Sequence, residues 1–248
     1  MSGPVDLRPD GEGGVTSTPP PGADEPGDPR GSWGPVKVLA GLGGLLALTI
    51  FAGVTAAIFD PELESLGAKL YLQAVLAASM IAVAFVAAGE NGPAGPRALG
   101  LGPSLRSPVV PALIAVGTYL VVAVVITSLF QPEQEDVTRE LGFGQSAFGD
   151  MASFFLIVIA APLAEEIFFR GFMFAGIRSR APFAVAAAVS AGVWGLFHYT
   201  GPGSLAVVLQ LSLFGVILCW LYERTGSIRA PIFLHTVNNL LAFIVATS

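Results

Sequence analysis

The chain has 248 residues, of which 53% are apolar and only 12% are charged, about half the charge of an ordinary soluble domain. The mean hydropathy of +0.71 also argues against a soluble protein with a single core. The formal net charge of -6 argues against nucleic-acid binding through basic patches. The single cysteine, Cys219, excludes an internal disulfide and a cysteine-based zinc site. The chain has two histidines, His198 and His235, so any reaction that uses histidine must use one or both of them. We therefore expect a polytopic membrane protein.

Residues 1–34 differ in composition from the rest of the chain. They contain seven prolines and eight glycines, and their acidic residues outnumber their basic ones. Such a segment buries too little apolar surface to offset the entropy lost on ordering, so we expect a disordered cytoplasmic tail. The segment lacks the basic start and early apolar run of a signal peptide.

Long uncharged runs follow the tail, and each is long enough to cross a hydrocarbon core of roughly 30 Å. We expect an all-α fold with about seven transmembrane helices. They would comprise three N-terminal helices within residues 35–146 and a four-helix core within residues 147–248. The expected spans lie near residues 38–59, 70–89, 107–132, 148–178, 183–200, 204–222 and 230–248.

The basic residues give the expected orientation. With the N-terminus inside, ten of the twelve lysines and arginines lie on the cytoplasmic side, and Lys69 and Arg139 lie outside. This bias follows the positive-inside rule, so we expect an N-in, C-out protein that crosses the cell membrane several times. The cytoplasmic set is Arg8, Arg30, Lys37, Arg97, Arg106, Arg170, Arg178, Arg180, Arg224 and Arg229.

The long apolar stretch of the fourth span is interrupted by Glu165, Glu166 and Arg170. Polar residues inside a bilayer cost several kcal/mol unless they are paired, so they indicate function. Glu166 and Arg170 are four residues apart, which is the favourable spacing for an ion pair on a helix. Glu165 points about 100° away from Glu166 and has no local cation, which leaves it free to act elsewhere. The alternative is that both glutamates pair with Arg170 near a helix end, but one arginine does not account for two buried carboxylates.

Two further groups lie on later spans. Trp194 and His198 share a helix face, as do His235 and Asn239 in the last apolar helix. Each group also has a structural interpretation. His198 would be an interfacial anchor beside an aromatic residue, and His235 with Asn239 would form hydrogen bonds between helices.

The spacing around the turn near residues 180–182 predicts where these groups lie. Glu165 lies 16 residues before Ala181 and His198 lies 17 residues after it. Equal arms of an antiparallel hairpin bring residues to the same depth, so we expect Glu165 beside His198. His235 follows Arg229 by a few residues, so we expect it to lie at a shallower level unless residues 170–182 project beyond the membrane surface.

Three motifs in this order resemble the CPBP family of CAAX proteases and bacteriocin-processing enzymes. They are Glu165-Glu166-x-x-x-Arg170, an aromatic-x-x-x-His198 and His235-x-x-x-Asn239, and the stretch 223–231 is also similar. This family of membrane-embedded proteases includes the type II CAAX prenyl endopeptidase. The resemblance covers roughly residues 150–245. One departure is Trp194, where the family usually has Phe.

The resemblance implies roles for individual residues. Glu165 would activate a water molecule for attack on a peptide carbonyl, and His198 would orient the water or share its proton. His235 and Asn239 would hold the oxyanion, with Glu166 beside them as part of the catalytic set. Arg170 and Trp194 would give structural support. Zn²⁺ bound by Glu165, His198 and His235 and a metal-free glutamate mechanism both remain open.

We therefore expect an intramembrane endopeptidase that acts on a peptide or a lipidated protein in the bilayer, without nucleic-acid partners. The substrate would be of the prenylated CAAX type or of the bacteriocin type. One alternative is a non-catalytic immunity or scaffold protein, although Glu165, His198 and His235 are all present. Another is a proton-coupled transporter, which would predict inverted repeats that the sequence does not show.

Overall fold

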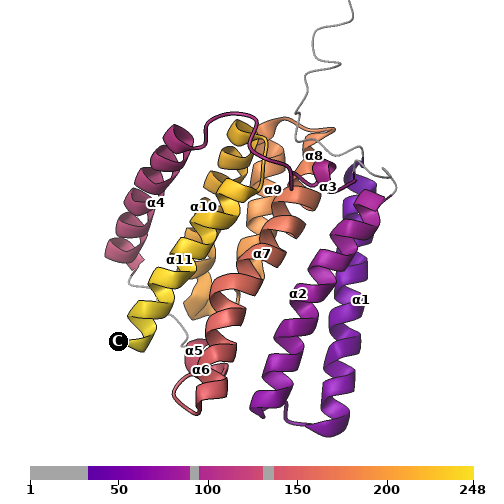
Figure 1. Ribbon diagram of the computed structural model, residues 1–248, viewed down its shortest axis with the longest axis vertical. Helices are drawn as coiled ribbons and strands as arrows, with labels where there is room; N and C mark the ends of the chain where they lie inside the picture. The colour runs from indigo at the N-terminus through magenta and orange to yellow at the C-terminus, as the bar shows by residue number, and fades with distance from the viewer. Residues whose placement is uncertain (1–32, 90–94, 131–136) are drawn as a thin grey trace, which may run out of the picture.

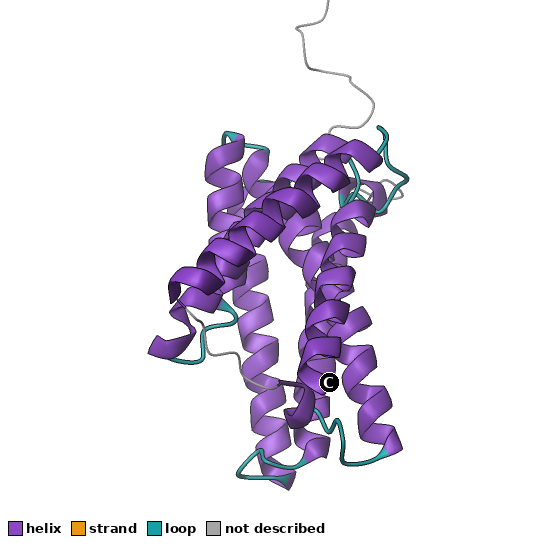
Figure 2. Cartoon of the chain, turned by 90° about the vertical axis from the view of Figure 1, so that its left-hand side faces the viewer, coloured by secondary structure: helices purple, strands orange, loops and turns teal. Residues whose placement is uncertain are grey.

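A computed structural model describes residues 33–89, 95–130 and 137–248 of the chain, and all regular secondary structure in these ranges is helical (Figure 2). The expected all-α fold is confirmed. The expected disordered tail lies almost entirely outside the described residues, as does most of the acidic loop before Glu140. The long helices are α1 (Pro35–Phe59), α2 (Leu66–Gly89), α4 (Val109–Phe130), α9 (Phe183–Leu196), α10 (Leu205–Thr225) and α11 (Arg229–Thr247).

Residues 147–178 form one continuous composite helix that switches from α-helical to π-helical hydrogen bonding and back at two places. Two stretches, η2 (Phe155–Ala160) and η3 (Glu166–Phe174), are π-helical, a form that is rare and often found at functional sites. Short helices α3 (Gly95–Ala98), α5 (Val137–Glu140) and η4 (Pro202–Ser204) lie in the connections. The composite helix consists of α6 (Ala147–Phe154), η2 (Phe155–Ala160), α7 (Ala161–Glu165), η3 (Glu166–Phe174) and α8 (Ala175–Arg178).

Six of the described helices are long and apolar enough to cross a membrane, and α9 is the exception to the seven expected spans. Its 14 residues cover about 21 Å, less than the roughly 30 Å of a hydrocarbon core. The chain still reverses direction from each long helix to the next, so α1 begins at one end of the bundle and α11 ends at the other (Figure 1). The protein is an integral, multi-pass membrane protein, and its N-in orientation stays a prediction.

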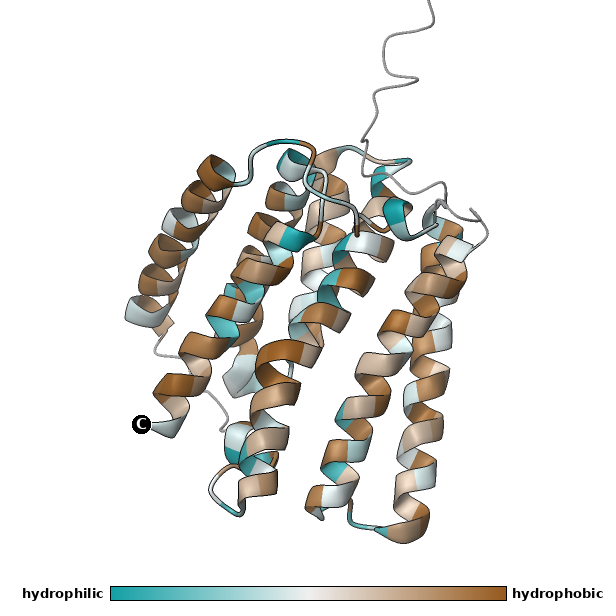
Figure 3. Ribbon diagram, viewed as in Figure 1, coloured by the Kyte–Doolittle hydropathy of each residue, from teal (hydrophilic) through white to brown (hydrophobic). Residues whose placement is uncertain are grey.

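The three long N-terminal helices pack on different sides of the molecule, and the expected division at residue 146 stays a prediction. The α1–α2 hairpin packs against α7, η3 and α8, whereas α4 packs against α10 on the opposite side of the molecule (Figure 1). The composite helix, α9, α10 and α11 therefore lie between the two. Most helix surfaces are apolar, and α11 carries a hydrophilic stretch midway along its length (Figure 3).

Small residues allow the closest helix contact in the bundle, between α9 and α10. A Cβ atom at Gly195 would meet the Val208 carbonyl oxygen at 2.8 Å, so a larger residue there would push α10 away. Gly226 ends α10 with a left-handed φ of 66°, and its N–H donates to the Tyr222 carbonyl. These two glycines fix the positions of α10 and of the start of α11 relative to α9.

Candidate active site

The predicted ion pair between Glu166 and Arg170 is present and completely buried. Nη1 of Arg170 lies 2.8 Å from Oε1 of Glu166, and both side chains have 0% exposure. Oε2 of Glu166 and both Nε and Nη2 of Arg170 are buried without a hydrogen-bond partner among the described residues. Burying a charge pair with unsatisfied donors costs free energy. The pair is therefore poorly explained by stability alone.

His235 connects the two adjacent glutamates. Its Nδ1 lies 2.9 Å from Oε1 of Glu166, and its Nε2 lies 3.9 Å from Oε2 of Glu165. The imidazole is almost buried, with 4% of its side chain exposed, whereas Glu165 keeps 16%. The expectation that His235 lies shallower than the glutamates is therefore wrong. The carboxylate of Glu166 orients the ring so that Nε2 faces Glu165.

Glu165 forms its shortest contact with Trp194. The indole Nε1 of Trp194 donates to Oε2 of Glu165 at 2.6 Å, which links α7 to α9. The guanidinium carbon of Arg170 lies 4.5 Å from the centroid of the indole ring, within cation–π range. Trp194 thus contacts the candidate base directly, in addition to the packing role predicted for it.

His198 forms its hydrogen bond with the backbone of Trp194, whose side chain in turn contacts Glu165. Helix α9 ends at Leu196, so His198 belongs to the following turn, and its Nδ1 lies 3.0 Å from the Trp194 carbonyl oxygen. Carbonyls in the last turn of a helix have incomplete backbone partners, which explains this contact. Among the described residues, the structure gives His198 no hydrogen bond or ion pair to Glu165. The partners that the structure gives Glu165 are Trp194 and His235.

Asn239 contacts the composite helix rather than His235. Its Nδ2 donates to the Ile157 carbonyl at 2.9 Å. Ile157 lies in η2, where the π pattern joins each carbonyl to the N–H five residues later. For Ile157 that residue is Pro162, which has no N–H. Asn239 therefore supplies a missing donor, and its second amide hydrogen remains for other partners.

Side chains also bind carbonyls of η3. The hydroxyl of Ser190 donates to the Phe169 carbonyl at 2.7 Å, and Nε1 of Trp33 donates to the Phe172 carbonyl at 2.8 Å. Irregular helix geometry in a membrane persists where such side chains satisfy the backbone. No sequence pattern singled out Ser190 or Trp33. For Asn239 and Ile157, the proline after the apolar run was a usable signal.

Zinc binding by Glu165, His198 and His235 stays a prediction. Within residues 33–89, 95–130 and 137–248, no group of three or more His, Cys, Asp or Glu side chains is placed to hold a metal ion. Glu165 and His235 approach each other, but the Nδ1 of His198 faces a carbonyl. The Nδ1 contact leaves Nε2 of His198 available as a ligand, because metal-binding histidines usually donate their other ring N–H to a carbonyl or carboxylate.

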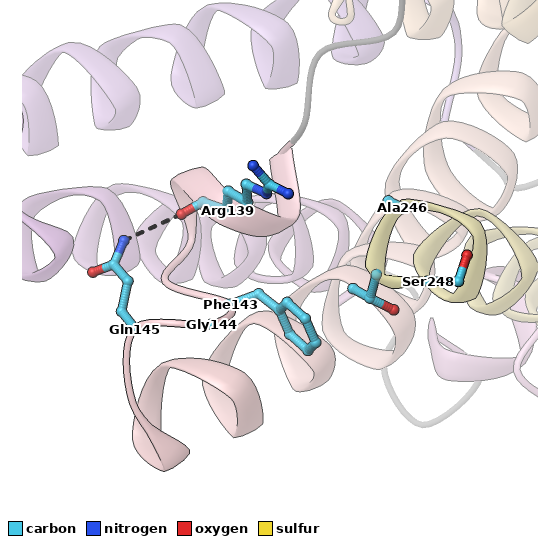
Figure 4. Close-up of a pocket in the computed structure, with 7 residues that line it drawn as sticks. Arg139, Phe143, Gly144, Gln145, Ala246 and Ser248 are labelled. Carbon is cyan, nitrogen blue, oxygen red and sulfur yellow. Dashed lines mark hydrogen bonds between the residues drawn. The ribbon is translucent and has the colours of Figure 1, made fainter.

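A cavity of about 470 Å³ lies at the end of the bundle where α11 terminates (Figure 4). None of the candidate catalytic residues lines it. Its walls come from the α5–α6 connection and the end of α11, where Gln145 donates to the Arg139 carbonyl at 3.4 Å. We therefore place the candidate active site around Glu165 and not in this cavity. The lining residues are Arg139, Phe143, Gly144, Gln145, Ala246, Thr247 and Ser248.

Comparisons with known proteins cover the same part of the chain as this site. Residues 147–241 match the family model described as type II CAAX prenyl endopeptidase Rce1-like. A protein of Bacillus subtilis (strain 168) named "Putative membrane peptidase YdiL" is 31% identical over 87 residues, which are 35% of this chain and 34% of that protein. The match thus spans about a third of that relative. No solved structure matches the chain. Residues 147–241, which carry Glu165, His235 and their partners, are therefore similar to the Rce1-like type II CAAX prenyl endopeptidases.

Proposed function

We propose that the protein is an intramembrane endopeptidase that hydrolyses a peptide bond with a water molecule activated by Glu165. One observation supports this proposal above the others. Glu165, Glu166 and His235 come together within the family match, with His235 2.9 Å from Glu166 and 3.9 Å from Glu165. Such a group of ionisable side chains inside a bilayer is typical of a functional site.

The proposed reaction begins with proton transfer from water to the Glu165 carboxylate. The water oxygen attacks the carbonyl carbon of the peptide, and the carbonyl oxygen becomes an oxyanion. The C–N bond then breaks, and the proton held by Glu165 passes to the leaving amine. Glu165 keeps 16% of its side chain exposed, which gives water and a peptide access to it.

His235 and Asn239 are the proposed donors to the oxyanion. Donors that are fixed before the reaction stabilise developing charge most strongly where bulk water is excluded. Because Nδ1 of His235 faces the Glu166 carboxylate, the ring donates through Nε2 only when both nitrogens carry hydrogen. The proposal therefore requires the doubly protonated form of His235. His198 would assist by orienting the water molecule from the turn after α9.

Glu166 and Arg170 are proposed to hold His235 and the composite helix rather than to transfer protons. Oε1 of Glu166 accepts from both Arg170 and His235, at 2.8 and 2.9 Å. This carboxylate is completely buried, which separates it from substrate. We propose a membrane-associated peptide or lipidated protein of the prenylated CAAX type or the bacteriocin type as the substrate, and the cell membrane as its location.

The test uses the full chain reconstituted in lipid nanodiscs. It is incubated with a prenylated CAAX-type peptide, the same peptide without its lipid, and a bacteriocin-leader peptide, and fragments are identified by mass spectrometry. We expect cleavage of at least one peptide by the wild-type chain and none by Glu165→Gln. Equal cleavage by both chains would contradict the proposed role of Glu165.

Metal dependence is tested on the same preparation. Zinc per chain is measured before and after dialysis against a strong chelator, and peptide cleavage is followed in parallel. The proposed glutamate mechanism predicts that cleavage continues after verified removal of metal. Loss of cleavage that zinc restores would contradict the metal-free mechanism and favour zinc bound by Glu165, His198 and His235.

A further inference from the structure

The two oxygens of the Glu165 carboxylate have different surroundings. Oε2 accepts the indole N–H of Trp194 at 2.6 Å and lies 3.9 Å from Nε2 of His235. Among the described residues, none forms a hydrogen bond with Oε1. The side chain remains 16% exposed. One oxygen is therefore fixed by the protein, and the other is available to water or substrate.

Trp194 itself has little freedom to move. Its residue exposure is 1%, and the Arg170 guanidinium lies 4.5 Å above its ring. The rings of His198 and His235 approach its ring at 5.3 and 5.2 Å, both in near-perpendicular arrangements. Arg170 is in turn held by Glu166 at 2.8 Å. The indole N–H is thus a fixed donor, connected through Arg170 to the buried ion pair.

An indole offers one N–H and accepts no hydrogen bond, so it fixes a single oxygen of its partner. A general base must lie within hydrogen-bonding distance of the proton that it abstracts. Small displacements of a reacting group reduce rates severely, because a misplacement of about 1 Å costs roughly 10²-fold. Rotation of a free Glu165 carboxylate would present either oxygen to water, and the indole contact suppresses this rotation.

We propose that Trp194 is a positioning residue, which fixes Oε2 of Glu165 through its indole N–H and thereby presents Oε1 to the reacting water. The role rests on the proposed function of Glu165 as the base. Trp194 does not touch the substrate in this proposal. It acts through the carboxylate, and its contribution is one of orientation, which affects the chemical step more than substrate binding.

The kinetic test compares Trp194→Phe with Trp220→Phe in the full chain. Phenylalanine keeps an aromatic ring beside Arg170 but removes the N–H, whereas Trp220 lies on α10 with its ring near Arg224. We expect Trp194→Phe to lower kcat about tenfold with KM within about twofold of wild type, since orientation affects the chemical step. We expect Trp220→Phe to keep both values. Wild-type kcat in a folded Trp194→Phe chain would overturn the proposal.

The Glu165→Gln chain separates the two hypotheses. If Glu165→Gln is inactive while Trp194→Phe keeps wild-type kcat, the positioning role fails and the function of Glu165 stands. If Glu165→Gln is fully active, the proposed function fails, and the positioning role that rests on it falls as well.

A spectroscopic test remains decisive if Trp194→Phe does not fold. The chain has three tryptophans, so ¹⁵N labelling gives three indole signals, which Trp33→Phe and Trp220→Phe help to assign. In the Glu165→Ala chain, we expect the Trp194 indole proton to move upfield because its carboxylate acceptor is gone, and the other two signals to stay. Three unmoved signals would show that Trp194 does not hold Glu165.

Discussion

The composite helix of residues 147–178 and helix α4 are both apolar spans, yet they differ sharply in burial. Half of the most apolar 18-residue window of the composite helix is buried, against 11% of that in α4, although α4 has the higher hydropathy, 2.6 against 1.9. Helix α4 packs mainly on α10 and presents most of its surface outwards. The composite helix is enclosed by its neighbours. Enclosure allows charged residues and π-helical backbone inside a membrane, because protein groups replace the missing water.

The largest effect expected from this comparison concerns the buried ion pair. Arg170→Met leaves the Glu166 carboxylate buried without its cation, so we expect the free energy of unfolding to fall by about 3–5 kcal/mol. Denaturant titration in mixed micelles measures the change. The matched control is Val121→Ala on α4, whose side chain is 64% exposed, with an expected change within about 0.5 kcal/mol. Equal losses in both variants would remove the contrast between the two helices.

A smaller effect is expected at the π-helical carbonyl of Ile157. Asn239→Leu removes its side-chain donor and should cost about 1 kcal/mol, the scale of polar contacts between membrane helices. Pro162→Ala gives residue 162 an N–H, so Asn239→Leu should cost less in that background. If the same titrations gave an equal cost in both backgrounds, the missing N–H of Pro162 would not be the reason for the Asn239 contact.

The smallest effect is expected at the partly exposed ion pair between Arg178 in α8 and Glu223 in α10. Nη2 of Arg178 lies 2.9 Å from Oε1 of Glu223, and the side chains are 22% and 28% exposed. Partly exposed ion pairs contribute about 0.2–1 kcal/mol. We expect Arg178→Met to destabilise by that amount at low salt and by less at high salt, because salt screens the pair. If Arg178→Met lowered the free energy of unfolding as much as Arg170→Met, burial would not determine how much an ion pair contributes to stability.

The sequence predicts the helical fold and the Glu166–Arg170 pair because both depend on local spacing. Apolar runs of sufficient length indicate spans, and a separation of four residues places two side chains together on a helix. The family motifs also predict Glu165, Trp194 and His235 as site residues, although they do not predict the contacts between them.

The arrangement between helices was less predictable. Placing Glu165 beside His198 assumed two α-helical arms of equal rise, whereas η3 is π-helical and α9 ends at Leu196. In the structure His235 contacts Glu166, and His198 contacts the carbonyl of Trp194. Hydropathy and spacing give no signal for a π-helical turn, and the closeness of Arg229 in sequence does not fix the level of His235.

The central claim is that Glu165 is the base and its neighbour Glu166 is not, and paired substitutions to glutamine test it most directly. Peptide cleavage and thermal melting are measured for Glu165→Gln and Glu166→Gln in the same detergent. We expect Glu165→Gln to lose at least about 10²-fold in turnover with melting little changed, the scale of general-base removal. Glu166→Gln should lose less turnover and more stability, because its buried carboxylate binds Arg170 and His235. A Glu165→Gln chain that cleaves like wild type, beside a folded but inactive Glu166→Gln chain, would show that the two roles are reversed.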